Sequence, residues 1–201
     1  GPPTDENAHP HTDDESEVAV VHNGVIENYA ELRTELTASG ATFSSDTDTE
    51  VVPHLISRRL DAGADPEAAF RTAIGRLEGS YAIAALIEDE HTLYAARDGS
   101  PLVIGIDGEE RYLASDVPAF LEFTEDVVYL EDGHVAILDR EGTRVTDQSG
   151  APVDYEVETV DWDAEETGKS GYDHYMLKEI YAQPTALRNT IEGRIDSANG
   201  R

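Results

Sequence analysis

The hydrophobic pattern changes near residue 80, and this change constrains the fold more than any other feature of the sequence. From there on, short apolar or alternating segments follow one another, and acidic or glycine-containing breaks separate most of them. Such spacing is typical of antiparallel strands joined as hairpins. The segments span residues 80–87, 91–97, 102–106, 111–115, 126–130, 134–139 and 143–145. We therefore expect a sheet-rich second half, interrupted by a helical turn over residues 117–123.

The first part of the chain instead shows helical periodicity after one short apolar run. Residues 18–22 predict a buried strand that ends at Asn23-Gly24, and residues 41–44 predict a second, brief strand. Residues 1–17 are expected to be irregular. Helices are predicted over residues 28–39, from Asp48 or Thr49 to 62, and over 66–77. Strands, then helices, then many strands predict an α+β domain built in layers.

The charge of the chain bears on its partners. It has 14 Lys and Arg against 43 Asp and Glu, a formal net charge of −29. Phosphates would be repelled, which argues against nucleic acid and anionic lipid as partners. Disorder is one explanation of so much charge, but 39% of the residues are hydrophobic and fall in periodic blocks. We therefore expect a folded protein with an acidic surface of the kind that halophiles use.

Several absences in the sequence exclude whole classes of function. No run of about 18 apolar residues occurs, so no membrane span is expected. The sequence has no cysteine, which excludes disulfides, thiolate zinc sites and a cysteine nucleophile within these residues. Neither the phosphate-binding glycine loop nor the dinucleotide-binding glycine motif is present.

Asn23-Gly24, which follows the buried run 18–22, is the first candidate site. An asparagine amide and a glycine N–H are two neutral donors of the kind that stabilise a tetrahedral oxyanion. The competing interpretation is a plain Asn-Gly turn that joins two elements.

The acidic segment before the second predicted helix is the other candidate site. Asp48 could display its carboxylate to the ammonium group of a ligand if Thr49 caps the helix. The competing interpretation is that Asp48 or Thr49 is only a cap, with Glu50 favoured by the helix dipole.

His9-Pro10-His11 supplies half of a metal site without further ligands at suitable spacing. The segment 98–102 is most simply a tight turn before a strand. These residues alone do not specify a reaction.

Several motifs of this sequence resemble the glutaminase half of the glutamine–fructose-6-phosphate aminotransferases, over nearly all 201 residues. His-Asn-Gly and Ser-Asp-x-Asp-Thr-Glu are shared more widely, by glutamine amidotransferases with an N-terminal nucleophile, whereas the GSPLVIG and HYMxKEIxxQP patterns are more specific. The segments that carry the resemblance are GPPTDENAHPH (1–11), VVHNGVIENYAELR (20–33), SSDTDTEVV (44–52), GSYAIA (79–84), RDGSPLVIG (97–105), ASD (114–116) and YDHYMLKEIYAQP (172–184).

The resemblance implies a four-layer α-β-β-α sandwich of two antiparallel sheets between helices, of the N-terminal nucleophile hydrolase type. It also implies glutamine hydrolysis by an N-terminal cysteine, with the ammonia passed to fructose 6-phosphate to make glucosamine 6-phosphate. Asn23 and Gly24 would form the oxyanion hole, and Asp48 would bind the α-ammonium of glutamine. Ser100 and Pro101 would shape a turn near the site. No cofactor and no metal are implied. The parent enzyme would be cytoplasmic and would dimerise through its isomerase half.

The chain also departs from the family pattern. It has no cysteine, and the Arg-Trp-Ala-Thr-His run of the family does not stand before Gly1. We therefore expect an N-terminally truncated fragment that is inactive alone, with free sheet edges. Residues 1–157 would be a partial glutaminase domain, 158–171 an acidic linker, and 172–201 the helical lead-in to an isomerase domain that is missing. Two alternatives stay open: the glutaminase half of an amidophosphoribosyltransferase, or a cysteine-free regulatory domain that binds glutamine or a partner.

Overall fold

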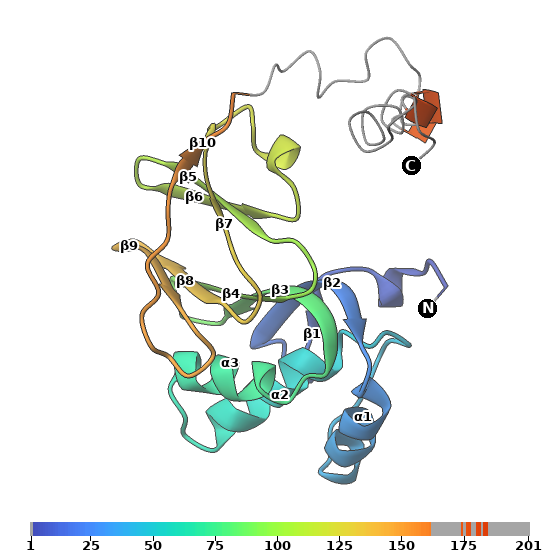
Figure 1. Ribbon diagram of the computed structural model, residues 1–201. Coiled ribbons are helices and arrows are strands. Elements are labelled where there is room, and N and C mark those ends of the chain that lie inside the picture. The colour runs from blue at the N-terminus through green and yellow to red at the C-terminus, as the bar shows by residue number, and fades with distance from the viewer. Residues whose placement is uncertain (1, 162–173, 175, 178–179, 182, 185–201) are drawn as a thin grey trace, which may run out of the picture. The chain divides into compact units, whose positions relative to one another are not determined.

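The computed structural model shown in Figure 1 describes residues 2–161, 174, 176–177, 180–181 and 183–184. The chain divides into two compact units, Gly1–Val160 and Asp161–Arg201. The first unit contains every helix and strand discussed below. The helical lead-in predicted over residues 172–201 lies largely outside the described residues, as does most of the predicted linker.

Two antiparallel sheets form the centre of the first unit. One has six strands in the order β1-β2-β3-β4-β8-β9, and the other has four in the order β10-β7-β5-β6. The strands are β1 (His11–Thr12), β2 (Val18–Ile26), β3 (Gly79–Ile87), β4 (Leu93–Asp98), β5 (Val103–Asp107), β6 (Glu110–Ala114), β7 (Asp126–Tyr129), β8 (Val135–Asp139), β9 (Gly142–Thr146) and β10 (Glu158–Thr159). Three α-helices lie between β2 and β3 in the chain: α1 (Tyr29–Ala38), α2 (Val51–Asp61) and α3 (Pro66–Ile74).

One face of the six-stranded sheet packs against the helices and part of the other packs against the four-stranded sheet, and side chains alternate between the two faces along each strand. On β3, Tyr81, Ile83 and Ala85 pack against the helices, whereas Ala82 packs against the four-stranded sheet. A third cluster joins the outer face of the four-stranded sheet to the 3-10 helix η2 (Val117–Ala119) and to Phe120. The fold class is therefore confirmed: two stacked antiparallel sheets, with α1 to α3 covering one outer face (Figure 1).

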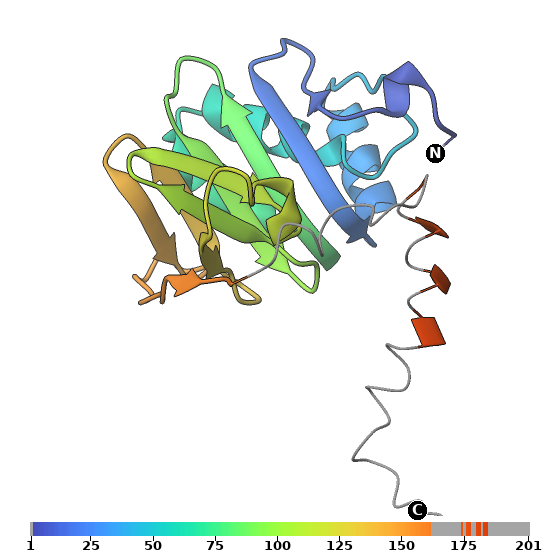
Figure 2. The same cartoon turned by 90° about the horizontal axis from the view of Figure 1, so that it is seen from above.

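The four-stranded sheet covers only part of its neighbour. The hydrophobic core between the sheets contains residues of β3, β4, β8 and β9 from the larger sheet and none of β2. Figure 2 shows β2 running along the uncovered side. Val21 of β2 is consequently 44% exposed. The side chains of β2 are therefore free to line cavities, which is where the candidate site lies.

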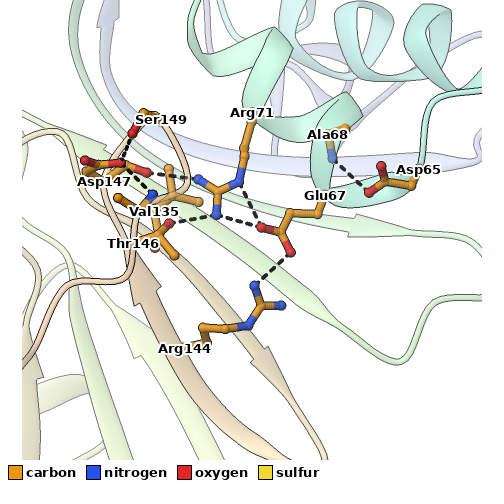
Figure 3. Close-up of polar contacts among 10 residues, drawn as sticks. Asp65, Glu67, Ala68, Arg71, Val135, Arg144, Thr146, Asp147 and Ser149 are labelled. Carbon is orange, nitrogen blue, oxygen red and sulfur yellow. Dashed lines mark hydrogen bonds and ion pairs between the residues drawn. The ribbon is translucent and has the colours of Figure 1, made fainter.

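A polar network fastens α3 to the opposite edge of the larger sheet (Figure 3). Arg71 donates to the carboxylate of Glu67, to the hydroxyl of Thr146 and to the carbonyl of Asp147. Arg144 on β9 donates to the second oxygen of Glu67 at 2.9 Å. At the start of α3, the side chain of Asp65 accepts the Ala68 N–H and caps the helix.

Most of the predicted elements are present, with ends that move by a few residues. All seven strands predicted after residue 79 are found, as are the three helices, although α3 ends at Ile74. Two elements were missed because they are very short: β1 lies within the segment expected to be irregular, and β10 pairs with β7 although its residues were placed in the linker. The helical turn predicted over 117–123 is η2 and the turns after it.

Two local predictions are wrong. Residues 41–44 form no strand, because that segment is bound to side chains instead: Thr42 N–H donates to Asp14, and Ser44 N–H donates to Glu50. The strand predicted to stop at His22 continues to Ile26, since Asn23 and Gly24 stay paired with Ala82 and Tyr81 of β3. Asn23-Gly24 is thus part of a strand, and the interpretation as a simple turn is wrong.

Candidate active site

The end of β2 and the segment before α2 line one open cavity of about 420 Å³. Its walls include Asn23 and Gly24 from β2 and Asp48 from the loop 46–49. His9, His11 and His22 also line it. The structure therefore brings together the three residues that the sequence singled out, across more than twenty positions of the chain.

Gly24 occupies a position that only glycine fits. Its φ is +129°, a backbone conformation that side chains rarely adopt. A Cβ atom there would lie 2.1 Å from the carbonyl oxygen of Ser80 and 2.9 Å from the Cα atom of Tyr81. The absence of a side chain lets β2 keep its pairing with β3 at the cavity wall.

Asn23 presents its side chain on the exposed side of β2. The amide Nδ2 donates a hydrogen bond to the hydroxyl of Ser115, which follows β6, at 2.5 Å. An asparagine amide carries two N–H donors. The contact with Ser115 fixes the orientation of the group and leaves a second donor for a ligand.

Asp48 is half-buried and is held by the backbone of β2. Its Oδ2 accepts the N–H of Ile26 at 2.7 Å, while Oδ1 accepts no hydrogen bond from the described residues. Asp48 does not cap α2, because the N-cap position of that helix is Glu50. No side chain makes a cap hydrogen bond to α2 at that position. The prediction that Asp48 or Thr49 serves as a helix cap is therefore wrong, and the carboxylate is available to a cation in the cavity.

The buried histidine of β2 links the strand to the loop. His22 is 6% exposed, and its Nδ1 lies 2.9 Å from the hydroxyl of Thr49. Burial lowers the pKa of His22, and the nearby charge of Asp48 opposes this only in part. Burial likewise lowers the pKa of His11, so both rings are neutral at neutral pH.

The two histidines suspected of metal binding do not form a metal site in the described part of the chain. The rings of His9 and His11 meet edge to face with centroids 5.3 Å apart. Across residues 2–161 and the few described beyond them, no group of three or more histidine, aspartate or glutamate side chains could hold a metal ion. In the same residues no helix is long and apolar enough to cross a membrane.

The predicted turn over residues 98–102 is confirmed and reaches β3. The N–H of Ser100 donates to the carbonyl of Asp98, Gly99 has a φ of +72°, and the hydroxyls of Ser100 and Ser80 lie 3.2 Å apart. Ser80 pairs with Val25, the residue after Gly24. This turn therefore supports the strand behind the cavity.

Sequence analysis missed the role of Glu50. This carboxylate is only 2% exposed and accepts four hydrogen bonds from Ser44 and Ser45. Burial acts to raise its pKa, but these hydrogen bonds outweigh it, so that the pKa of Glu50 is lowered. Acidic residues are common throughout this sequence, so nothing in the pattern distinguished this one.

Comparison with known proteins assigns the family. A sequence profile of the glutamine amidotransferase domain matches residues 3–122. The chain belongs to the glutamine amidotransferase family. It is 53% identical to the glutamine–fructose-6-phosphate aminotransferase (isomerizing) of Methanothermobacter thermautotrophicus over 192 residues, and 51% identical to that of Symbiobacterium thermophilum over 201 residues. These matches cover 95% and 100% of the chain but only 32% and 33% of the relatives.

Two solved structures support the fold. The glutamine phosphoribosylpyrophosphate amidotransferase of B. subtilis, complexed with ADP and GMP, matches with a TM-score of 0.60 at 26% identity, over 73% of this chain and 33% of its own. A class-II glutamine aminotransferase domain protein from Silicibacter pomeroyi matches with a TM-score of 0.50 at 24% identity, over 73% and 72% of the two chains. The amidotransferase fold of the chain is thus supported by both sequence and structure.

Proposed function

We propose that this chain is the glutamine-binding part of a glutamine–fructose-6-phosphate aminotransferase (isomerizing). In this proposal, Asp48 binds the α-ammonium of glutamine, and the Asn23 amide and the Gly24 N–H stabilise the oxyanion. The observation that carries the proposal is the single cavity that holds all three residues. The high identity to two aminotransferases, over nearly the whole chain, supports the choice of parent enzyme.

The proposed chemistry proceeds through a thioester. A cysteine thiolate attacks the side-chain carbonyl carbon of glutamine, a C–S bond forms, and the carbonyl oxygen becomes an oxyanion. The oxyanion collapses, the C–N bond breaks, and the nitrogen leaves as ammonia with the proton that the α-amino group of the cysteine has taken from its thiol. Water then cleaves the thioester to give glutamate. The ammonia is transferred to fructose 6-phosphate, which yields glucosamine 6-phosphate in the parent enzyme.

The residues of this chain contribute binding and charge stabilisation to that sequence of steps. Neutral donors aimed at a developing oxyanion act without needing to reorganise during the reaction. Asn23 is already oriented by its bond to Ser115. Asp48, whose Oδ1 accepts no hydrogen bond from the described residues, lines the same cavity and supplies the negative charge that an ammonium group requires.

The nucleophile is the part of this chemistry that the 201 residues do not contain, since the sequence has no cysteine. We therefore propose that the chain alone does not hydrolyse glutamine. We also assign the parent enzyme to the cytoplasm and propose that it is a homodimer through its isomerase half. The acidic surface we interpret as an adaptation to high salt.

Glutaminase assays on two proteins test the proposal. The 201-residue chain is expected to release no ammonia from glutamine above a buffer blank. The full-length protein that carries this segment and a cysteine nucleophile is expected to hydrolyse glutamine and to form glucosamine 6-phosphate from fructose 6-phosphate. Ammonia release by the isolated chain would contradict the proposed role of the cysteine. A full-length protein that uses phosphoribosyl pyrophosphate instead would favour the amidophosphoribosyltransferase.

The B. subtilis structure is the observation that favours that second candidate, because that protein is a glutamine phosphoribosylpyrophosphate amidotransferase. Its identity to this chain is 26%, whereas the first aminotransferase reaches 53%. The aminotransferase is therefore the better supported parent. A regulatory domain without cysteine would bind glutamine at the same cavity yet stay inactive in the full-length protein.

A further inference from the structure

We propose that Glu50 is a positioning residue, which closes the segment 44–50 into a rigid loop and thereby fixes the carboxylate of Asp48 in the cavity. Nothing in the family assignment gives Glu50 a role. The part of the inference that concerns glutamine rests on the proposed function of Asp48. The part that concerns the loop rests on contacts within this chain alone.

Glu50 binds two adjacent serines in the turn that precedes Asp48. Its Oε1 accepts the N–H and the hydroxyl of Ser44, at 2.7 and 2.9 Å. Its Oε2 accepts the N–H and the hydroxyl of Ser45, at 2.7 and 2.6 Å. A buried carboxylate without a cationic partner is tolerated only when such donors satisfy it. All four donors come from two adjacent residues, so the carboxylate defines the backbone of that turn.

The loop that Glu50 closes contains Asp48. Two neighbouring side chains of the loop are tied to β2, because Oδ2 of Asp48 accepts the N–H of Ile26 and the hydroxyl of Thr49 lies 2.9 Å from Nδ1 of His22. A third, Thr47, lies 3.2 Å from Nε2 of His11. The loop is therefore held to the strand by Asp48 and Thr49, and to itself by Glu50.

The contacts of Glu50 serve no other element that would explain them. Glu50 stands at the N-cap position of α2 but makes no cap hydrogen bond to the helix. Its carboxylate points back to Ser44 and Ser45, which form neither helix nor strand. A residue that only stabilised α2 would bind the first N–H groups of that helix. The geometry instead directs the bonds of Glu50 to the segment that leads into Asp48.

Hydrogen exchange on the 201-residue chain tests the first part of the proposal. The amide of Ile26 reports on the position of Asp48, because its N–H donates to that carboxylate. Glu50→Gln keeps the shape of the side chain but replaces one acceptor oxygen by an amide NH₂, which cannot accept the hydrogen bonds that the serines donate. We expect exchange at Ile26 to become at least about tenfold faster in this variant. Asp48→Ala, which removes the acceptor, sets the upper limit.

Two further variants separate positioning from loss of stability. Ser44→Ala removes one hydroxyl donor from Glu50 and is a milder change, so it serves if Glu50→Gln does not fold. We expect it to accelerate exchange at Ile26 in the same direction but less. Arg71→Met breaks the network between α3 and β9 far from the cavity. It should lower the melting temperature while exchange at Ile26 keeps its wild-type rate, measured under strongly native conditions.

Kinetics of the full-length protein test the part that concerns substrate. In Glu50→Gln, KM for glutamine is expected to rise about tenfold, with a smaller change in kcat, as for a residue that acts through ground-state binding. Arg71→Met should leave KM unchanged. If the wild-type protein shows no glutaminase activity, the proposed function fails, and exchange at Ile26 still decides the role of Glu50. The positioning role is wrong if the Ile26 amide exchanges at the same rate in Glu50→Gln and Ser44→Ala as in Arg71→Met.

Discussion

Replacing Gly24 by alanine gives a quantitative test of why a glycine stands in the cavity wall. The new Cβ atom would lie 2.1 Å from the carbonyl oxygen of Ser80, well short of the 3.4 Å where ordinary contact begins. The three nearest atoms to that position are all backbone atoms of β3, so no side chain can move aside. The strands β2 and β3 must therefore separate locally.

The cost of that separation has two parts. A side chain at such a φ value costs about 1–3 kcal/mol in backbone strain. Loss of two hydrogen bonds between β2 and β3 adds about 1–3 kcal/mol. Gly40→Ala is the matched control, because Gly40 has a φ of +108° but nothing lies within 4 Å of its Cβ position. The control should show the strain alone.

Thermal and urea unfolding of both variants measure the difference. For a domain of this size, 1 kcal/mol corresponds to about 2–4 °C in the melting temperature. We expect Gly24→Ala to melt about 4–8 °C below Gly40→Ala, from the additional 2 kcal/mol or so that the backbone contact contributes. Equal melting temperatures would show that β2 and β3 accommodate the extra atom, and would refute the close approach at Gly24.

Two further predictions concern the charges of the chain. The pKa of Glu50 is lowered in the folded state, so its contribution to stability is fully present above the unfolded pKa of about 4.3 and is lost as the pH falls toward the folded value. Urea unfolding as a function of pH should show a shallower loss of stability below about pH 4.3 in Glu50→Gln, and an unchanged slope would contradict it. The net charge of −29 predicts self-repulsion, so stability should rise between low salt and about 1 M KCl. A melting temperature that does not respond to salt would contradict an adapted acidic surface.

The elements that could be predicted from the sequence are those whose signals are local. The strands after residue 79 alternate and are separated by turn residues, and α3 begins with Asp65 and Pro66, which cap and open a helix. These signals depend on neighbours in the chain. The secondary structure that they predict is therefore the one that the folded protein adopts.

The elements that sequence analysis missed depend on contacts across the fold. The strand β2 continues past Asn23-Gly24 because β3 lies alongside, a partner that is more than fifty residues away in the chain. The start of α2 was misjudged because Asp48 and Thr49 bind Ile26 and His22 rather than the helix. Both errors come from tertiary hydrogen bonds that outcompete local ones.

The candidate site was predictable in its residue types and unpredictable in its arrangement. A short polar pair after an apolar run and a carboxylate before a helix suggested Asn23, Gly24 and Asp48, and the family resemblance assigned their roles. The cavity that unites them is lined by β2 and by the loop 46–49, which a bond from the Ile26 N–H to Asp48 ties to β2 across the fold. Glu50 looked like one acidic residue among many, because its function lies in four bonds to the preceding turn.

Binding of the α-ammonium of glutamine by Asp48 is tested by measuring kcat/KM of the full-length protein with Asp48→Ala. A hydrogen-bonded charge pair contributes about 1.5–3 kcal/mol, so kcat/KM for glutamine should fall about 10- to 100-fold, mainly through KM. Asp61→Ala, which removes one negative charge at the exposed end of α2, is the control and should keep the wild-type value. If Asp48→Ala also keeps the wild-type kcat/KM, the assignment of this cavity as the glutamine site is wrong.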